Sequence, residues 1–355
     1  RWYRATLRLG RDCQLQVEAL ETTGSRFRQL SATASLDWTG WDGLVRLCLA
    51  AHPEATGVSA CYNGKLEAPQ LQAASGDELL IDCGWAFEQG IDTDTVSNTT
   101  DPALDGRLIN LPTRAVTGHA WDGSHRDWRI RPGHYAAIHF HEDDLYDAGW
   151  PAAVTWQVPD SLRSGLYAGR FDIDDETWRV PFAVLPCQPG QSADIALLLP
   201  SASYLAYAND HCHLVGANPQ LLTGRLLRLR EADLVLAARS DLGLSLYDRH
   251  RDGSGSHFSS WLRPILNMLP GHATWLGGPG SGLWQLGADT HLIDWLETRG
   301  FDCEVITDEA LHARGAGLLA HYRVVITGTH PEYTSTRMWD GLHAYLNNGG
   351  RLLSM

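Results

Sequence analysis

The pattern of hydrophobic and polar positions divides the chain into a long β-rich part and a C-terminal α/β part. Up to about residue 187, apolar and polar residues alternate in short runs separated by Gly, Asp and Asn, a pattern typical of half-buried strands. From about residue 191 the apolar runs become continuous, as in residues 194–199, which indicates strands buried on both faces. Helical spacing follows in residues 289–299 and 334–347.

We therefore expect three domains in a multidomain β plus α/β protein. The alternating runs of residues 1–105 are predicted to form a β-sandwich, with a hairpin at 61–66 whose type I′ turn is Asn63-Gly64. YNGKLEA at 62–68 also resembles a hairpin of lectin-like jelly rolls (laminin-G or concanavalin type). Residues 106–187 are predicted to form a β-rich, Trp-containing domain, with strands over 152–159, 165–171 and 178–184. Residues 188–355 are predicted to form a doubly wound α/β domain of the Rossmann or glutamine-amidotransferase type.

Net charge, apolar runs and cysteine spacing restrict the partners and the cellular compartment that we expect. The net charge of -14 argues against a nucleic-acid backbone or an anionic membrane surface. No apolar run approaches the ~18 residues that a membrane span needs. The seven cysteines are scattered without a CxxC pair, which favours reduced thiols and a cytoplasmic protein. Because strand-like residues 351–353 almost end the chain, and because it starts with Arg1, we expect a segment of a longer polypeptide.

The segment YRVVITGTHPEY, residues 322–333, carries the first candidate chemistry. Its β-branched run is predicted to form a buried strand, and His330 and Glu332 follow directly after it. Ligands of open α/β sheets bind outside the carboxyl ends of the strands. The two side chains are therefore candidates for binding or catalysis, although His330 can also cap the strand and Glu332 the following helix.

Tyrosines follow other strands of the same predicted sheet. Tyr204 and Tyr207 come after residues 194–199, and Tyr247 lies in the polar-aromatic segment 244–248. If these loops meet Glu332, phenols and a carboxylate would surround one point, and such hard oxygen donors favour a hard cation such as ferric iron. The alternative is that the tyrosines belong to the core, with hydrogen-bonded hydroxyls.

A second candidate metal site lies in the middle of the chain. His139 and His141 are two residues apart on a predicted strand, so that both point to one face. Asp143 or Asp144 would complete a set of two histidines and one carboxylate. Hydrogen bonding at a strand end is the alternative role of these residues.

Longer motifs point to a known family. SASYLAYAND (201–210), LGLSLYDRHRDGSGSHFSSWLRPI (242–265), DTHLIDWLETRGFDCEVITDEALH (289–312) and YRVVITGTHPEYTSTRMWDGLHAYLNNGGRLL (322–353) together resemble the large (beta) subunit of N,N-dimethylformamidase. Residues 111–150 resemble the region that precedes the catalytic domain in that family, and the YNGK hairpin fits its lectin-like module.

The resemblance implies an amidohydrolase with a mononuclear iron, expected as Fe³⁺, held by two tyrosines and one glutamate. Mapped onto this sequence, the metal ligands are Tyr207, Tyr247 and Glu332, with Tyr204 as the alternative to Tyr207. Tyr207 is preferred because it stands in the AYxN context. His330 would act as an acid–base group beside Glu332.

The family also implies a reaction and partners. Water activated by the metal would cleave the C–N bond of N,N-dimethylformamide or a related small amide, giving dimethylamine and formate. A small accessory subunit and homo-oligomerisation are expected, whereas nucleic acid and membrane are not. The alternative function is a non-catalytic carbohydrate-binding or assembly protein built on the jelly-roll module.

Overall fold

The chain forms two compact units, Arg1–Glu142 and Asp143–Met355, in a computed structural model. The structure describes residues 1–9, 14–22, 29–35, 47–54, 58–75, 78–174, 176–212, 229, 231–269 and 285–355. Within these residues the fold is rich in β-structure, with several small sheets and a few helices. The division into three domains, 1–105, 106–187 and 188–355, stays a prediction, as do the jelly roll and the doubly wound assignment.

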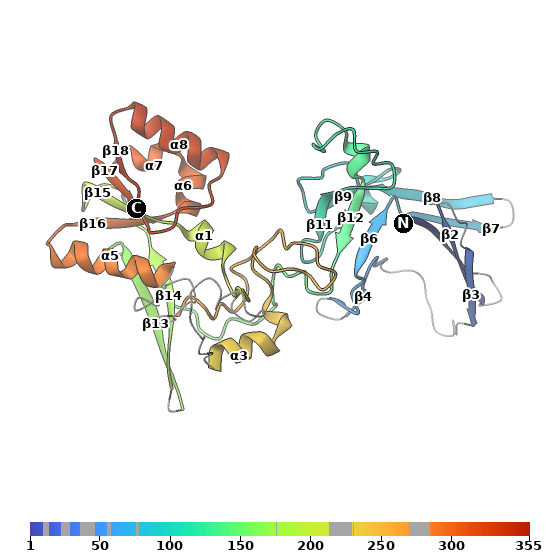
Figure 1. Cartoon of the computed structure of the whole chain (residues 1–355), viewed down its shortest axis with the longest axis horizontal. Coiled ribbons are helices and arrows are strands. Elements are labelled where there is room, and N and C mark those ends of the chain that lie inside the picture. Colours follow the sequence, from blue (N-terminus) through green and yellow to red (C-terminus); the bar gives the residue numbers. More distant parts are fainter. Residues whose placement is uncertain are drawn as a thin grey trace, which may run out of the picture. The chain divides into compact units, whose positions relative to one another are not determined.

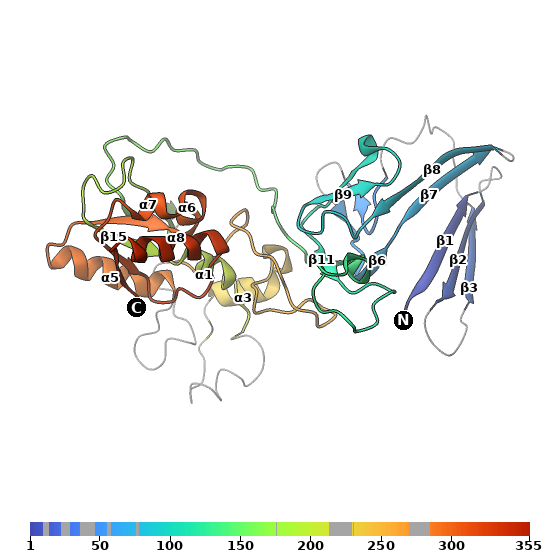
Figure 2. The ribbon, with the colours of Figure 1, turned by 90° about the horizontal axis from the view of Figure 1, so that it is seen from above.

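The described strands of the N-terminal unit pair in antiparallel fashion, as their alternating sequence pattern predicts (Figure 2). Phe87, Val96 and Ile138 form a small buried core there. The sheets are β1-β2-β3 (Tyr3–Leu9, Gln14–Glu21, Gln29–Ser35), β4-β5 (His52–Pro53, Val58–Ser59), β10-β9-β8-β7 (Gly106–Arg107, Thr95–Asn98, Glu78–Ala86, Gln70–Ser75) and β11-β12-β6 (Thr113–Val116, Ala137–Phe140, Gly64–Glu67).

The predicted hairpin at residues 61–66 is wrong. Residues 61–63 are outside any strand, and β6 pairs instead with β12, with Leu66 opposite Ile138. The Asn63 side chain accepts a hydrogen bond from the Glu142 backbone N–H at 2.8 Å. Asn63 therefore serves a long-range contact rather than a tight turn, which sequence-local turn signals cannot reveal.

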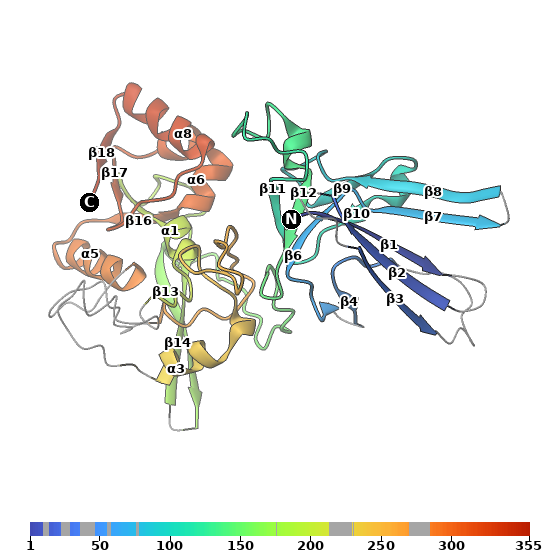
Figure 3. The ribbon, with the colours of Figure 1, turned by 45° about the vertical axis from the view of Figure 1, so that its right-hand side comes forward.

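The C-terminal unit contains a long antiparallel hairpin of β13 (Gly165–Ile173) and β14 (Glu176–Val184), close to the predicted strands 165–171 and 178–184 (Figure 3). The strand predicted over 152–159 is wrong, because these residues have no regular structure. Its alternating apolar residues Val154, Trp156 and Val158 are all exposed. Alternation alone does not make a strand where no neighbouring strand pairs with it.

A parallel four-stranded sheet forms the centre of this unit. Its order is β16-β15-β17-β18, and every neighbouring pair is parallel. The continuous apolar run of β15 pairs on both sides, which explains why it lacks alternation. The strands are β15 (Ile195–Leu199), β16 (Cys303–Thr307), β17 (Val324–Thr327) and β18 (Arg351–Leu353). Strands β15, β17 and β18 lie close to the predicted strands.

Helices cover both faces of this sheet (Figure 1). Leu286 and Leu296 of α5 pack with Leu197 on one face, and Leu311 and Tyr345 pack against the other. No helix of the described part is long and apolar enough to cross a bilayer. The α-helices are α1 (Ser201–Ala206), α3 (Glu231–Ala238), α5 (Leu286–Thr298), α6 (Asp308–Arg314), α7 (Ala316–Leu319) and α8 (Thr336–Asn347).

The order of the strands creates a reversal point between β15 and β17. From β15 the chain continues through α5 to β16 along one face, and from β17 it continues through α8 to β18 along the opposite face. Chain segments that leave neighbouring parallel strands in opposite directions leave a crevice at the carboxyl ends, where ligands of such sheets bind. Residues that directly follow β15 and β17 are thus in the position to form a site.

Candidate functional site

Tyr207, Tyr247 and Glu332 meet at the carboxyl ends of β15 and β17. The Tyr207 hydroxyl donates a hydrogen bond to Oε2 of Glu332 at 2.8 Å, and the Tyr247 hydroxyl donates to Oε1 at 2.9 Å. The two phenol rings stack, with centroids 4.0 Å apart and an interplanar angle of 19°. Side chains as far as 125 positions apart in sequence thus converge on one carboxylate. The structure brings together the three residues that the sequence predicts as ligands.

Tyr207 is held by the end of α1. It terminates the helix, with its N–H donating to the Ser203 carbonyl at 3.1 Å, and its own carbonyl accepts from Asn267 Nδ2 at 2.7 Å. Asn209 follows in the left-handed region (φ 58°), which Asn tolerates better than most residues. Asn209 is fully buried and donates to the Pro264 carbonyl at 2.8 Å. These bonds fix the direction in which the Tyr207 ring leaves the helix.

Tyr247 is tied to the same helix through the main chain. The N–H of its neighbour Leu246 donates to the Ala206 carbonyl at 2.9 Å, which sets the distance between the two tyrosine-bearing segments. The buried Arg263 guanidinium joins them again by donating to carbonyls on both sides, and its burial lowers its pKa to about 10. These two carbonyls belong to Ala208 (3.2 Å) and Leu244 (2.9 Å).

Glu332 stands in the loop between β17 and α8. Its backbone N–H donates to the hydroxyl of the fully buried Ser203 at 2.9 Å, which joins this loop to α1. The side chain of Glu332 is 40% exposed, and Tyr247 is 38% exposed. Main-chain hydrogen bonds therefore hold the cluster in place, while the side chains of Glu332 and Tyr247 remain partly exposed to solvent.

The loop leaves β17 through a tight passage at Gly328. A Cβ atom at this position would lie 2.4 Å from Pro200 Cδ and 2.7 Å from Asp289 Oδ2, so that only glycine fits without displacement. The next N–H, of Thr329, donates to Oδ1 of the fully buried Asp289 at 2.6 Å. Asp289 on α5 thus holds the start of the loop that carries His330 and Glu332.

Tyr204 does not belong to this cluster. Its side chain is buried, and its hydroxyl donates a short hydrogen bond to Oδ2 of Asp289. Burial, together with the negative charge of Asp289, raises the pKa of Tyr204 well above its ordinary value. The geometry therefore selects Tyr207, not Tyr204, as the tyrosine of this helix that faces Glu332.

His330 lies next to the cluster with a defined hydrogen-bond partner. Its Nδ1 is 3.3 Å from Nε2 of Gln285, and its Nε2 is 3.6 Å from Glu332 Oε2. A side-chain amide nitrogen can only donate, so Nδ1 is the acceptor in this contact. Gln285 is buried, with φ 54° and ψ −129°, and its Oε1 has no hydrogen-bond partner among the described residues.

Both phenols of the cluster are held in the protonated form. Burial, the largest cause, raises the pKa of Tyr207 and of Tyr247 far above the ordinary value, and the hydrogen bonds to Glu332 raise it further. Tyr247 acts on Tyr207 in the opposite direction without reversing the shift. A cation that takes the place of the phenol protons must supply the free energy of deprotonation through its own binding.

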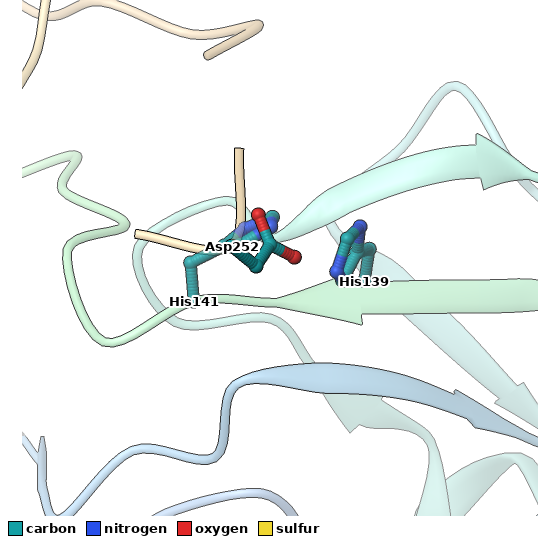
Figure 4. Close-up of side chains that lie close together, drawn as sticks. All are labelled: His139, His141 and Asp252. Atoms are coloured by element: carbon teal, nitrogen blue, oxygen red, sulfur yellow. The ribbon is translucent and has the colours of Figure 1, made fainter. Parts of the chain in front are cut away.

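The histidine pair in the middle of the chain has the expected local geometry. His139 at the end of β12 and His141 directly after it lie side by side, with ring centroids 4.1 Å apart (Figure 4). Each ring offers a nitrogen within 4.8 Å of the other ring's nitrogen. Asp143, one of the two carboxylates predicted to join them, pairs with His250 Nδ1 at 2.6 Å. A metal bound by these residues stays a prediction.

Three residues at the site were not assigned from the sequence. Tyr333, whose hydroxyl lies 2.8 Å from that of Tyr247, directly follows Glu332, and this adjacency was the available signal. Asp289 heads the helical pattern of 289–299, where an acidic residue looks like an ordinary helix start. Gln285 had no signal in the sequence, because its role depends on the backbone angles that turn it toward His330.

The fold and site define a class of protein: a parallel α/β sheet that presents two tyrosines and a carboxylate at its carboxyl edge. A comparison with protein families identifies the lineage. Residues 113–355 match the family described as N,N-dimethylformamidase beta subunit-like, C-terminal. Because this match covers more than half of the sequence, the chain belongs to that family, and the predicted resemblance is confirmed.

Curated relatives support the same family. The chain is 37% identical over 322 residues to the N,N-dimethylformamidase beta subunit of Alcaligenes sp, and 38% identical over 324 residues to that of Paracoccus aminophilus. Each alignment covers 85% of this chain and 42% of the relative. The chain thus spans about two fifths of the length of these proteins.

Proposed function

We propose that this chain carries the metal-binding centre of an amide hydrolase, with iron held by Tyr207, Tyr247 and Glu332. The observation that carries the proposal is the meeting of these three side chains around the two Glu332 oxygens, at 2.8 and 2.9 Å. The names of the relatives indicate N,N-dimethylformamide or a similar small amide as substrate. The β16-β15-β17-β18 sheet would act as the doubly wound scaffold that delivers the ligands.

The donor set fits a hard, highly charged cation. Phenolate and carboxylate oxygens are hard ligands, and none of the three proposed ligands offers a soft sulfur or an imidazole. Two phenolates and one carboxylate supply three negative charges, which match Fe³⁺. When bound, the ion would act as a Lewis acid toward the amide carbonyl or toward water. The hydrogen bonds in the described cluster occupy the oxygens that the ion would take over.

His330 would supply the proton that the departing amine needs. Gln285 Nε2 lies 3.3 Å from His330 Nδ1 and orients the ring, so that Nε2 of His330 faces the cluster 3.6 Å from Glu332 Oε2. A secondary amine such as dimethylamine leaves far more readily as the protonated species, so a positioned N–H lowers the barrier to C–N cleavage. The exposed outer side of the cluster gives a small amide direct access from solvent.

We also propose that the protein that contains this chain assembles with other subunits. The relatives are named beta subunits, which implies at least one other kind of subunit in their complexes. We expect the same of the protein that contains this chain. The accessory subunit and homo-oligomerisation would then complete the environment of the centre.

Metal analysis of the full-length protein tests the proposal. We expect one iron per copy in the wild type, and in Tyr247→Phe and Glu332→Ala a loss of amidase activity and a fall in iron affinity so large that iron binds only when supplied in excess. Tyr204→Phe is the matched control, because it removes a hydroxyl from the same helix that bonds Asp289 and not Glu332. Iron retained by both site variants, or lost only in Tyr204→Phe, would contradict the assignment.

A further inference from the structure

A third tyrosine touches the candidate metal centre. The hydroxyl of Tyr333 lies 2.8 Å from the hydroxyl of Tyr247, within normal hydrogen-bond distance. Tyr333 is half-buried and directly follows Glu332, so that the loop after β17 reaches Tyr247 with two consecutive side chains. One of them is the proposed ligand Glu332. The other has no role in the function described so far.

The direction of the Tyr333–Tyr247 hydrogen bond follows from counting protons. A phenol has one proton to donate, and an ionised carboxylate can only accept. The Tyr247 proton is directed to Glu332 Oε1 at 2.9 Å, and the Tyr207 proton to Oε2 at 2.8 Å. The proton between Tyr247 and Tyr333 therefore belongs to Tyr333. Tyr333 is a donor, and the Tyr247 oxygen is its acceptor.

We infer that Tyr333 is a positioning residue that donates a hydrogen bond to the Tyr247 oxygen when that oxygen binds the metal as a phenolate. The inference rests on the proposed function. A hydrogen bond to a charged acceptor is roughly twice as strong as one between neutral groups, so the contact strengthens in the metal-bound state. Tyr333 cannot replace Tyr247 as a ligand while it donates to it.

The hydrogen bond has two measurable consequences for the centre. It draws electron density from the Tyr247 oxygen, which lowers the energy of the electrons that phenolate ligands transfer to ferric iron on absorption of visible light. It also orients the Tyr247 ring relative to Glu332 and so favours metal binding. Partners of metal ligands typically contribute about 10- to 100-fold to metal affinity.

Tyr333→Phe in the full-length, iron-loaded protein tests the inference. We expect the visible phenolate-to-iron absorption band to move to longer wavelength, and the iron affinity measured against a chelator to fall about 10- to 100-fold. Tyr345→Phe is the matched control, since it removes another tyrosine hydroxyl of the same unit, one that bonds the Arg351 carbonyl. The control should leave band and affinity unchanged.

A double variant separates the hydrogen bond from a general loss of structure. In a Tyr247→Phe background, Tyr333→Phe should change neither the remaining absorption nor the residual iron affinity, because the acceptor is already gone. An unchanged band and affinity in Tyr333→Phe, or an equal loss with and without Tyr247, would overturn the inference. If the wild type binds no iron, the proposed function fails instead, which is a distinguishable result.

Discussion

The two ends of the parallel sheet each hold a glutamate that accepts hydrogen bonds from tyrosine, yet the two arrangements serve different purposes. Near the amino ends of the strands, Glu304 on β16 is almost completely buried and accepts from the Tyr322 hydroxyl at 2.6 Å. It also accepts from the N–H groups of Gly190 and Ser192 at 2.8 and 2.9 Å. Beyond the carboxyl ends, Glu332 is 40% exposed and accepts from two phenols.

The difference shows what distinguishes a binding site from a structural contact in this fold. Main-chain N–H groups cannot move away without unfolding the segment, so the lone pairs of Glu304 are permanently occupied. The phenols on Glu332 are acidic groups, and in the proposed function they exchange their protons for a cation. A tyrosine–carboxylate pair alone therefore says little about function. The other partners of the carboxylate and its exposure decide its role.

The largest expected effect is on activity, at the carboxyl-end glutamate. Glu332→Gln removes the charge of one of the three proposed ligands but keeps the shape of the side chain. We expect kcat/KM to fall on the order of a thousandfold, which corresponds to about 4 kcal/mol of transition-state stabilisation. The free energy of unfolding of the metal-free protein should change by less than ~0.5 kcal/mol, because the side chain is partly exposed. Steady-state kinetics and denaturant unfolding measure the two quantities.

The amino-end glutamate should give the opposite result. Glu304→Ala leaves the part-buried Gly190 and Ser192 N–H groups and the buried Tyr322 hydroxyl without their acceptor. Unpaired buried donors of this kind cost about 1–3 kcal/mol each, with partial relief from water, so we expect a loss of about 3 kcal/mol in unfolding free energy. Iron content of the folded fraction should remain at the wild-type level. A loss of iron without a loss of stability would reverse the roles of the two ends.

The third largest expected effect concerns Gly328, where the loop that carries Glu332 leaves β17. Gly328→Ala places a methyl group 2.4 Å from Pro200 Cδ, and backbone or Asp289 must move to relieve the clash. Overpacking of this kind typically costs about 1–3 kcal/mol. Because the displaced loop carries Glu332, iron affinity should fall together with stability, in contrast to both glutamate variants. Gly317→Ala tests whether any glycine has this effect, since nothing lies within 4 Å of a Cβ there and its backbone is not in the positive-φ region.

Most of the parallel sheet and of the long helices that cover it could be predicted from the sequence. Strands β15, β17 and β18 and helices α5 and α8 lie close to their predicted positions, since apolar runs and helical spacing depend little on tertiary context. The strand over 152–159 and the hairpin over 61–66 failed because pairing partners, not local pattern, decide such short elements. Helix α1 was not predicted at all, since six residues hold too little periodicity.

The site was predictable only as far as strand ends and family motifs reach. Glu332 follows a clear strand, so its position at the sheet edge needed no coordinates. Tyr204 and Tyr207 lie three positions apart, and only the helix geometry shows that one faces Asp289 and the other Glu332. The donor role of Tyr333 depends on proton directions between side chains. No sequence pattern contains this information.

The smallest expected effect is the part of the pH dependence that Glu304 contributes at the amino end. Burial alone would raise the pKa of Glu304, but hydrogen bonds from Ser192 and Tyr322 outweigh it, so that the folded-state pKa lies below the ordinary value. A lowered pKa adds stability that is fully present above the unfolded pKa of ~4.3 and is lost as pH falls through the folded pKa. Wild type should therefore lose more unfolding free energy between pH 6 and acid pH than Glu304→Gln.

Denaturant unfolding of both proteins across this pH range measures the difference. Asp308, whose burial raises its pKa to about 7, titrates in both proteins and cancels in the comparison. Glu332→Gln, which leaves the amino end intact, should follow the wild-type pH dependence at Glu304. If Glu304→Gln and wild type instead lose stability in parallel on acidification, the charge of Glu304 does not stabilise the fold. The contrast between the two ends of the sheet would then reduce to exposure alone.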